Sequence, residues 1–139
     1  MDNLSKAREL LVGERTCVLC RGEEVYFTDQ RGVRPLLTWL DQGLQGEGFS
    51  AADRVVGRAT AFLYCLLGVK EVYARVMSTP AMEVLRANNI TALCDREVDG
   101  IINRRGDGPC PFEAAVLHIR EPREALEAIR AQMIRMGIQ

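Results

Sequence analysis

The sequence predicts an α/β protein in which helices pack on both faces of a mixed sheet. Three observations indicate this class. Helix-like and strand-like segments alternate along the chain, two neighbouring β-prone runs form a hairpin pattern, and the longest helix-like segment is apolar nearly all round. A length of 139 residues with 47% hydrophobic and 27% charged residues suits one core, so we expect residues 1–139 to form a single domain.

The N-terminal segment predicts a short helix followed by a hairpin. Residues 3–12 carry leucine and alanine at helical spacing, and Gly13 is placed where that helix should end. The runs 16–20 and 24–28 are β-prone, and the turn between them contains Gly22. Because a glycine-containing turn between two such runs favours antiparallel pairing, we expect a hairpin here.

The central segment carries the strongest helical pattern of the chain. Apolar residues recur at i, i+1, i+4, i+7, i+8, i+11 and i+12, namely Val55, Val56, Ala59, Phe62, Leu63, Leu66 and Leu67. We therefore expect one long helix over 51–67, buried between layers and ended by Gly68. Before it, residues 34–40 predict a short helix and the glycine-rich residues 41–49 predict a loop.

The remaining elements follow from alternation, helical spacing and proline. We expect strands over 71–77 and 90–94, and helices over 79–87, over 109–120 and from Pro122 onward.

Composition excludes several classes of function. With 18 basic and 19 acidic residues the formal net charge is −1, so no overall positive field favours nucleic acid, and nucleic-acid binding is not expected. No apolar run is long enough to span a bilayer, and the first six residues lack the apolar core of a signal peptide. We therefore expect a cytoplasmic protein without a membrane partner. Its five cysteines, an odd number, are expected to be reduced thiols.

The order of the expected elements resembles the cytidine-deaminase-like fold. The segments "DRVVGRATAFL", "GVKEVYA" and "INRRGDGPCPFE" look like a bacterial family of uncharacterised proteins assigned to that fold, and the resemblance covers residues 10–118. It implies a three-layer α/β/α sandwich whose mixed sheet carries an N-terminal antiparallel hairpin.

This sequence lacks the zinc-binding residues that an active member of the deaminase fold would need. An active zinc deaminase needs a His or Cys with a nearby Glu on the central helix, and two cysteines on the next helix. Residues 55–58 and 80–84 occupy these positions in the expected helices and contain no His, Cys or Glu at the required spacing. Without such a ligand set we predict no zinc deamination, no bound metal and no cofactor.

The start of the expected central helix could still receive a polar or anionic ligand through its backbone N–H groups. Asp53 follows Ser50 by three residues, so it is either part of a capping box or a ligand contact. Gly57 would allow close approach of another backbone or a ligand. Arg58 could bind an anion, or it could lie with its stem on apolar neighbours and its head in solvent.

A second group of candidates lies in the turn before the 109–120 segment. Asn103, Arg104 and Arg105 form a cationic stretch that could contact a phosphate or could belong to a solvated loop. Gly108 belongs to the glycine-rich turn that follows. These residues and the start of the central helix would together enclose a pocket for a small anionic or nucleotide-like ligand.

Cys110 and Glu113 are the candidate catalytic pair. Cys110 is expected in the first turn of a helix, where the helix dipole lowers a thiol pKa, and Glu113 lies one turn on, where it could accept a proton. A negative Glu also opposes thiolate formation. The alternative is that Cys110 fills a small buried position while Glu113 complements the dipole.

Three hypotheses about function follow, and the sequence does not decide whether the protein is an enzyme. The first is a deaminase-like domain without zinc that binds a small anionic or nucleotide-like ligand. The second is a cysteine-dependent enzyme that uses Cys110 with Glu113 as base. The third is a non-catalytic interaction domain whose apolar final helix, residues 126–136, mediates a homodimer.

Overall fold

The computed structural model describes residues 1–138 and contains one five-stranded mixed sheet with the strand order β2-β1-β3-β4-β5. Its strands are β1 (Cys17–Arg21), β2 (Glu24–Thr28), β3 (Ser50–Val56), β4 (Glu71–Ser78) and β5 (Thr91–Val98). The strand β1 pairs antiparallel with both β2 and β3, whereas β3, β4 and β5 run parallel. The sheet therefore joins an antiparallel pair to a parallel half.

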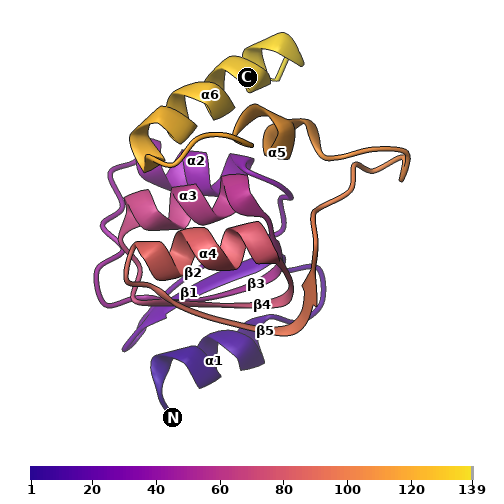
Figure 1. Cartoon of the computed structure of the whole chain (residues 1–139). Coiled ribbons are helices and arrows are strands. Elements are labelled where there is room, and N and C mark those ends of the chain that lie inside the picture. Colours follow the sequence, from indigo (N-terminus) through magenta and orange to yellow (C-terminus); the bar gives the residue numbers. More distant parts are fainter. Residues whose placement is uncertain (139) are drawn as a thin grey trace.

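The helices lie in separate layers on the two faces of this sheet (Figure 1). On one face lies α1 (Asn3–Leu10), and on the other lie α2 (Arg34–Asp41), α3 (Arg58–Leu67) and α4 (Thr79–Ala87). The last two helices, α5 (Pro111–Ala115) and α6 (Pro122–Arg135), pack over α3 on the side away from the sheet. None of the helices in the described part of the chain is long and apolar enough to cross a membrane.

Apolar side chains fill both interfaces of the sheet. The larger cluster lies between the sheet and α2, α3, α4 and α6, and it includes the fully buried Phe62, Leu63 and Ile129. The smaller cluster lies under α1 and includes Leu11 and Val18. Removing this apolar area from water is the main favourable term that holds the layers together.

The central helix expected over 51–67 is wrong in its first half. Residues 50–56 form β3, and the helix α3 begins only at Arg58, after Gly57 as its N-cap. Helices cover both faces of the sheet at β3, with α1 on one face and the α2–α4 layer on the other, so the apolar residues of β3 follow one another without alternation and can match a helical period by chance. The expected end at Gly68 is correct, since Gly68 adopts φ of 79° at the C-cap.

The helix expected over 109–120 is also wrong in its bounds. Only Pro111–Ala115 form α5, and Val116 to His118 turn back toward α6. The segment before it continues further than expected as strand, because β5 extends to Val98. Residues 99–110 are therefore a long loop that leaves the sheet edge and reaches the α5 helix, as Figure 1 shows.

Candidate functional site

The loop that joins β2 to α2 borders three cavities. The largest has a volume of about 840 Å³ and lies between this loop, the loop before α5 and the end of α6. Its lining includes four arginines, Arg31 and Arg34 from the first loop and α2, and Arg104 and Arg105 from the second. We call it the arginine cavity. Asp29 is the acidic residue in its lining.

The loop before α5 is shaped by its own hydrogen bonds. The Asn103 side-chain oxygen accepts from the backbone N–H of Gly106 at 2.8 Å, and its amide nitrogen donates to Asp107 at 2.8 Å. The backbone N–H of Asn103 donates to the carbonyl of Gly108 at 2.8 Å. Asn103 and Arg104 line the arginine cavity, whereas Gly108 supports the turn that presents them.

Cys110 lies at the edge of the arginine cavity as the N-cap residue of α5. The expectation that it lies inside the first helical turn is wrong, because the helix begins one residue later, at Pro111. Its backbone N–H donates to the carbonyl of Ile101 at 3.0 Å, and the residue is half-buried. The thiol is thus in reach of a molecule that fills the cavity.

Glu113 lies against the N-terminus of α3. Its carboxylate oxygens accept hydrogen bonds from the backbone N–H of Arg58 at 2.6 Å and of Ala59 at 2.8 Å. Two N–H groups that a helix leaves unsatisfied are therefore bonded by a carboxylate from a distant segment. Gly57 does allow a close approach, but the group that approaches is a side chain and not another backbone: a Cβ there would come within 2.7 Å of the Glu113 Cδ atom.

Arg58 holds the segment after α5. Its Nε donates to the carbonyl of Val116 at 3.1 Å, and its guanidinium also donates to the carbonyl of Ile119. The guanidinium lies 5.1 Å from the ring centroid of Phe62. The expectation that the head of Arg58 lies in solvent is therefore wrong, because carbonyls at the end of α5 take up its donors. Its role as a ligand contact stays a prediction.

Asp53 is in the middle of β3, where its partners across the strands are Cys17 and Ala74. The capping box expected from Ser50 and Asp53 is wrong, since no helix begins at these residues. The Tyr64 hydroxyl from α3 donates to the Asp53 carboxylate at 2.6 Å, and it lies 3.0 Å from the Cys17 sulfur. Burial raises the pKa of Asp53 to about 6.

This carboxyl belongs to the lining of a second cavity, of about 320 Å³, which we call the Asp53 cavity. Its walls include Cys17, Pro35, Leu36 and Val55. Burial and the nearby Asp53 raise the pKa of the Cys17 thiol well above its usual value, so Cys17 is a neutral thiol. Neither Cys17 nor Tyr64 was predicted from the sequence as a site residue. An Asp inside the largely apolar run "SAADRVV" is the signal that could have pointed to them.

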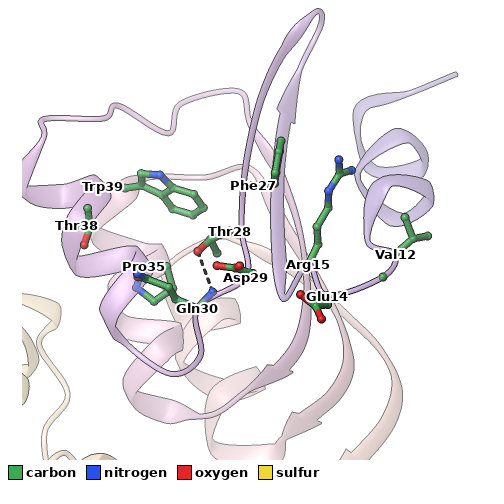
Figure 2. Close-up of a pocket in the computed structure, with 11 residues that line it drawn as sticks. Val12, Glu14, Arg15, Phe27, Thr28, Asp29, Gln30, Pro35, Thr38 and Trp39 are labelled. Carbon is green, nitrogen blue, oxygen red and sulfur yellow. Dashed lines mark hydrogen bonds between the residues drawn. The ribbon is translucent and has the colours of Figure 1, made fainter.

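The third cavity, of about 720 Å³, lies between α2 and β2. Figure 2 shows Pro35, Thr38 and Trp39 of α2 on one side, and Phe27 on the other. The guanidinium of Arg15 covers the Phe27 ring at 4.1 Å from the centroid. This surface is lined by one arginine, Arg15, in place of four, so we do not place the candidate site there.

The fold does not bring potential metal-ligating side chains of the described residues together in a group. Within residues 1–138, no group of three or more His, Cys, Asp or Glu side chains is placed to hold a metal ion. Cys17 and Cys20 point to opposite faces of β1, one into each apolar cluster. His118 is exposed in the turn after α5.

The comparisons with known proteins agree with each other. The model of a family described as a domain of unknown function, DUF1893 (TM1506), matches residues 6–133. Among solved structures, the crystal structure of a DUF1893 family protein (TM1506) from Thermotoga maritima is similar to this chain with a TM-score of 0.85. The two sequences are 21% identical, and the match covers 94% of this chain and 89% of that chain. No curated protein matches the chain.

Proposed function

The chain belongs to the DUF1893 family, a domain of unknown function, and we propose that it binds a small anionic or nucleotide-like ligand in the arginine cavity. The observation that carries this proposal is the lining of the cavity. Two separate loops bring Arg31, Arg34, Arg104 and Arg105 to one space of about 840 Å³. A guanidinium binds phosphate and carboxylate groups by paired hydrogen bonds, and the volume suits a ligand of nucleotide size.

We propose that the fold is deaminase-like but without zinc chemistry. The mixed sheet, with β1 antiparallel between β2 and β3 and helices following the parallel strands, supports the first part. The observed helices at the two expected positions are α3 and α4. They contain no histidine, and Cys65 near the end of α3 is the single cysteine in them. A zinc ligand set is thus missing at the corrected helix positions as well.

A second candidate function, cysteine-dependent catalysis, is favoured by the position of Cys110 at the edge of the same cavity. In this proposal the Cys110 thiol gives up its proton to a base, and its sulfur bonds to an electrophilic centre of a ligand held by the arginines and displaces a leaving group. Glu113 would be the base, although its carboxylate is hydrogen-bonded to the start of α3. A Cys110→Ser variant that keeps ligand binding but loses covalent capture by an electrophilic phosphate analogue would support this function. Equal capture by the variant would overturn it.

A homodimer through the final helix stays a third proposal. Ala125 and Ile129 of α6 are buried within this chain, so the surface left for a second copy is the end of the helix, where Ile134 is 77% and Met136 44% exposed. Light scattering over a range of concentrations tests it. A monomer at high concentration would contradict the dimer. The cytoplasmic location expected from the sequence likewise stays a prediction.

The ligand proposal is tested by calorimetry and thermal shift with inorganic phosphate, AMP and CMP. Binding should raise the melting temperature, since a ligand at 100 times its Kd stabilises the folded state by about 2.7 kcal/mol. The double variant Arg104→Ala/Arg105→Ala should weaken binding of all three compounds. Arg123→Ala, an exposed arginine on α6 outside the cavity, is the matched control. The proposal fails if phosphate and both nucleotides leave the melting temperature of the wild-type protein unchanged at 10 mM, roughly the weak end of specific binding.

A further inference from the structure

The Asp53 cavity and the arginine cavity adjoin each other. Gln30, Arg31 and Gly32 line both of them, so the β2–α2 loop forms a common wall between an arginine-lined space and a carboxyl-lined one. The two cavities differ in chemistry. The arginine cavity offers donors to an anion. The Asp53 cavity offers a carboxyl acceptor, and its lining also includes Thr16, Arg31 and Arg54 beside the apolar Pro35, Leu36 and Val55.

The packing of β3 does not account for the carboxyl of Asp53. The position is central in the sheet, with β1 on one side and β4 on the other, where an apolar side chain would be the usual occupant. Asp53 is 9% exposed, and among residues 1–138 it forms no ion pair with a basic side chain. A buried carboxyl without a cation is unfavourable, and such groups concentrate at functional sites.

The hydrogen bonds within the protein leave part of this carboxyl unsatisfied. Oδ2 accepts from the Tyr64 hydroxyl at 2.6 Å, whereas Oδ1 accepts from the backbone N–H of Val55 at the long distance of 3.4 Å. The Arg54 backbone N–H and the Cys17 thiol also act on this carboxyl, but the first donates to the Thr16 carbonyl at 3.1 Å and the second lies 3.0 Å from the Tyr64 hydroxyl. A carboxylate can accept about four hydrogen bonds. The position therefore has acceptor capacity left over for a molecule that enters the Asp53 cavity.

We propose that the Asp53 cavity is a second subsite, in which the Asp53 carboxyl accepts a hydrogen bond from an N–H donor of the ligand. This inference rests on the proposed function, because the same ligand places its anionic group among Arg31, Arg104 and Arg105. The ligand class is thus a small phosphate or carboxylate compound that carries an amine, an amidine or a ring N–H at its other end. Pro35, Leu36 and Val55 pack against the apolar part between the two ends.

Two pairs of phosphate compounds isolate the N–H donor. AMP is compared with purine riboside monophosphate, which lacks only the amino group, and phosphoethanolamine is compared with ethyl phosphate, which likewise lacks only the amino group. In at least one pair the compound with the donor should bind the wild-type protein at least tenfold more tightly. Asp53→Asn should abolish this preference while inorganic phosphate binds with unchanged affinity. Asp29→Asn is the matched control, since Asp29 lines the arginine cavity and not the Asp53 cavity.

A second variant tests the subsite independently, in case Asp53→Asn does not fold. Val55 lines the Asp53 cavity and is 47% exposed, so Val55→Trp narrows the cavity without replacing a buried side chain. It should also abolish the preference and leave phosphate binding intact. The subsite is refuted if neither pair shows a preference, or if the preference survives both variants. If inorganic phosphate does not bind the wild-type protein at all, the proposed function itself is refuted. Failure of the subsite and failure of the proposed function can therefore be distinguished.

Discussion

Glu113 and Arg58 are 55 residues apart in sequence, and the side chain of each one hydrogen-bonds to the backbone at or near the other. The Glu113 carboxylate accepts the backbone N–H of Arg58 at 2.6 Å, and the Arg58 side chain donates to the carbonyl of Val116 at 3.1 Å, three residues after Glu113. The start of α3 and the segment after α5 are thereby joined by a carboxylate that accepts from helix N–H groups and by a guanidinium that donates to backbone carbonyls. This contact fixes the loop that presents Arg104 and Cys110 to the arginine cavity.

Removing the Glu113 carboxylate should destabilise the protein. We expect Glu113→Ala to lower the free energy of unfolding by about 2 kcal/mol, because two backbone N–H groups at the start of α3 lose a charged acceptor. Glu113→Gln keeps an acceptor and should lose less. Urea unfolding of these variants measures the effect, with Glu127→Ala, an exposed glutamate on α6, as control. Equal stability of Glu113→Ala and Glu127→Ala would show that the contact contributes nothing.

Adding a methyl group at Gly57 should act through the same contact. A Cβ at this position would come within 2.7 Å of Glu113 Cδ and 2.9 Å of Ile101 Cγ1, so both side chains would have to move. The backbone is not the obstacle, since φ is −100°. We expect Gly57→Ala to destabilise the wild-type protein by about 2 kcal/mol and the Glu113→Ala variant by less, a coupling that a double-mutant cycle measures. Gly100→Ala, where a Cβ meets open space, is the control.

The stability of the protein should depend on the protonation of Asp53. Burial raises its pKa from 3.8 to about 6, so between these values the folded state binds a proton that the unfolded state releases. The stabilisation is complete below about pH 4 and is lost as the pH rises through about 6. From pH 4 to 7 the wild-type protein should therefore lose up to about 3 kcal/mol relative to Asp53→Asn. Unfolding curves of both proteins across this pH range check it, and parallel curves would contradict it.

The cysteines should differ in reactivity toward a soluble thiol reagent. Cys110 is half-buried at the edge of the arginine cavity, whereas Cys17 and Cys20 are fully covered within the two apolar clusters. We expect Cys110 to be labelled in the native protein, and Cys17 and Cys20 to be labelled only after unfolding. Mass spectrometry of peptides after brief labelling reads this out. If Cys110 is labelled as slowly as Cys17 in the native protein, the Cys110 thiol does not face the cavity.

Local signals in the sequence predicted many of the elements. Proline at the second position of α4 and the first of α6 marks both helix starts, and the β-branched and aromatic residues in "EVYARVM" mark β4. These signals work because they act within one turn or one strand. Residues 51–56 were wrongly predicted as helix because their structure depends on distant segments. The edges of β3 pair with β1 and β4, and its two faces are buried by α1 and by the helix layer on the other side of the sheet. A strand covered on both faces lacks the alternation that identifies strands.

The candidate site could be predicted only in part. The loop residues Asn103, Arg104 and Cys110 were identified from the sequence, and they do line one cavity. Arg31 and Arg34 were not, because nothing local indicates that the β2–α2 loop faces the loop before α5. The pairing of Cys110 with Glu113 stays a prediction, whereas the partners of Glu113 seen here, Arg58 and Ala59, could not be predicted at all.

The sequence by itself determined the α/β class, the absence of a zinc ligand set on the helices and the start of most helices, since these depend on residue types and near neighbours. Tertiary structure alone decided the rest. It made Asp53 a buried strand residue with a raised pKa, and it placed the Glu113 carboxylate on the α3 helix. Both outcomes depend on which distant segments pack together, because burial and hydrogen bonding across 11 and 55 residues arise only once the layers are assembled.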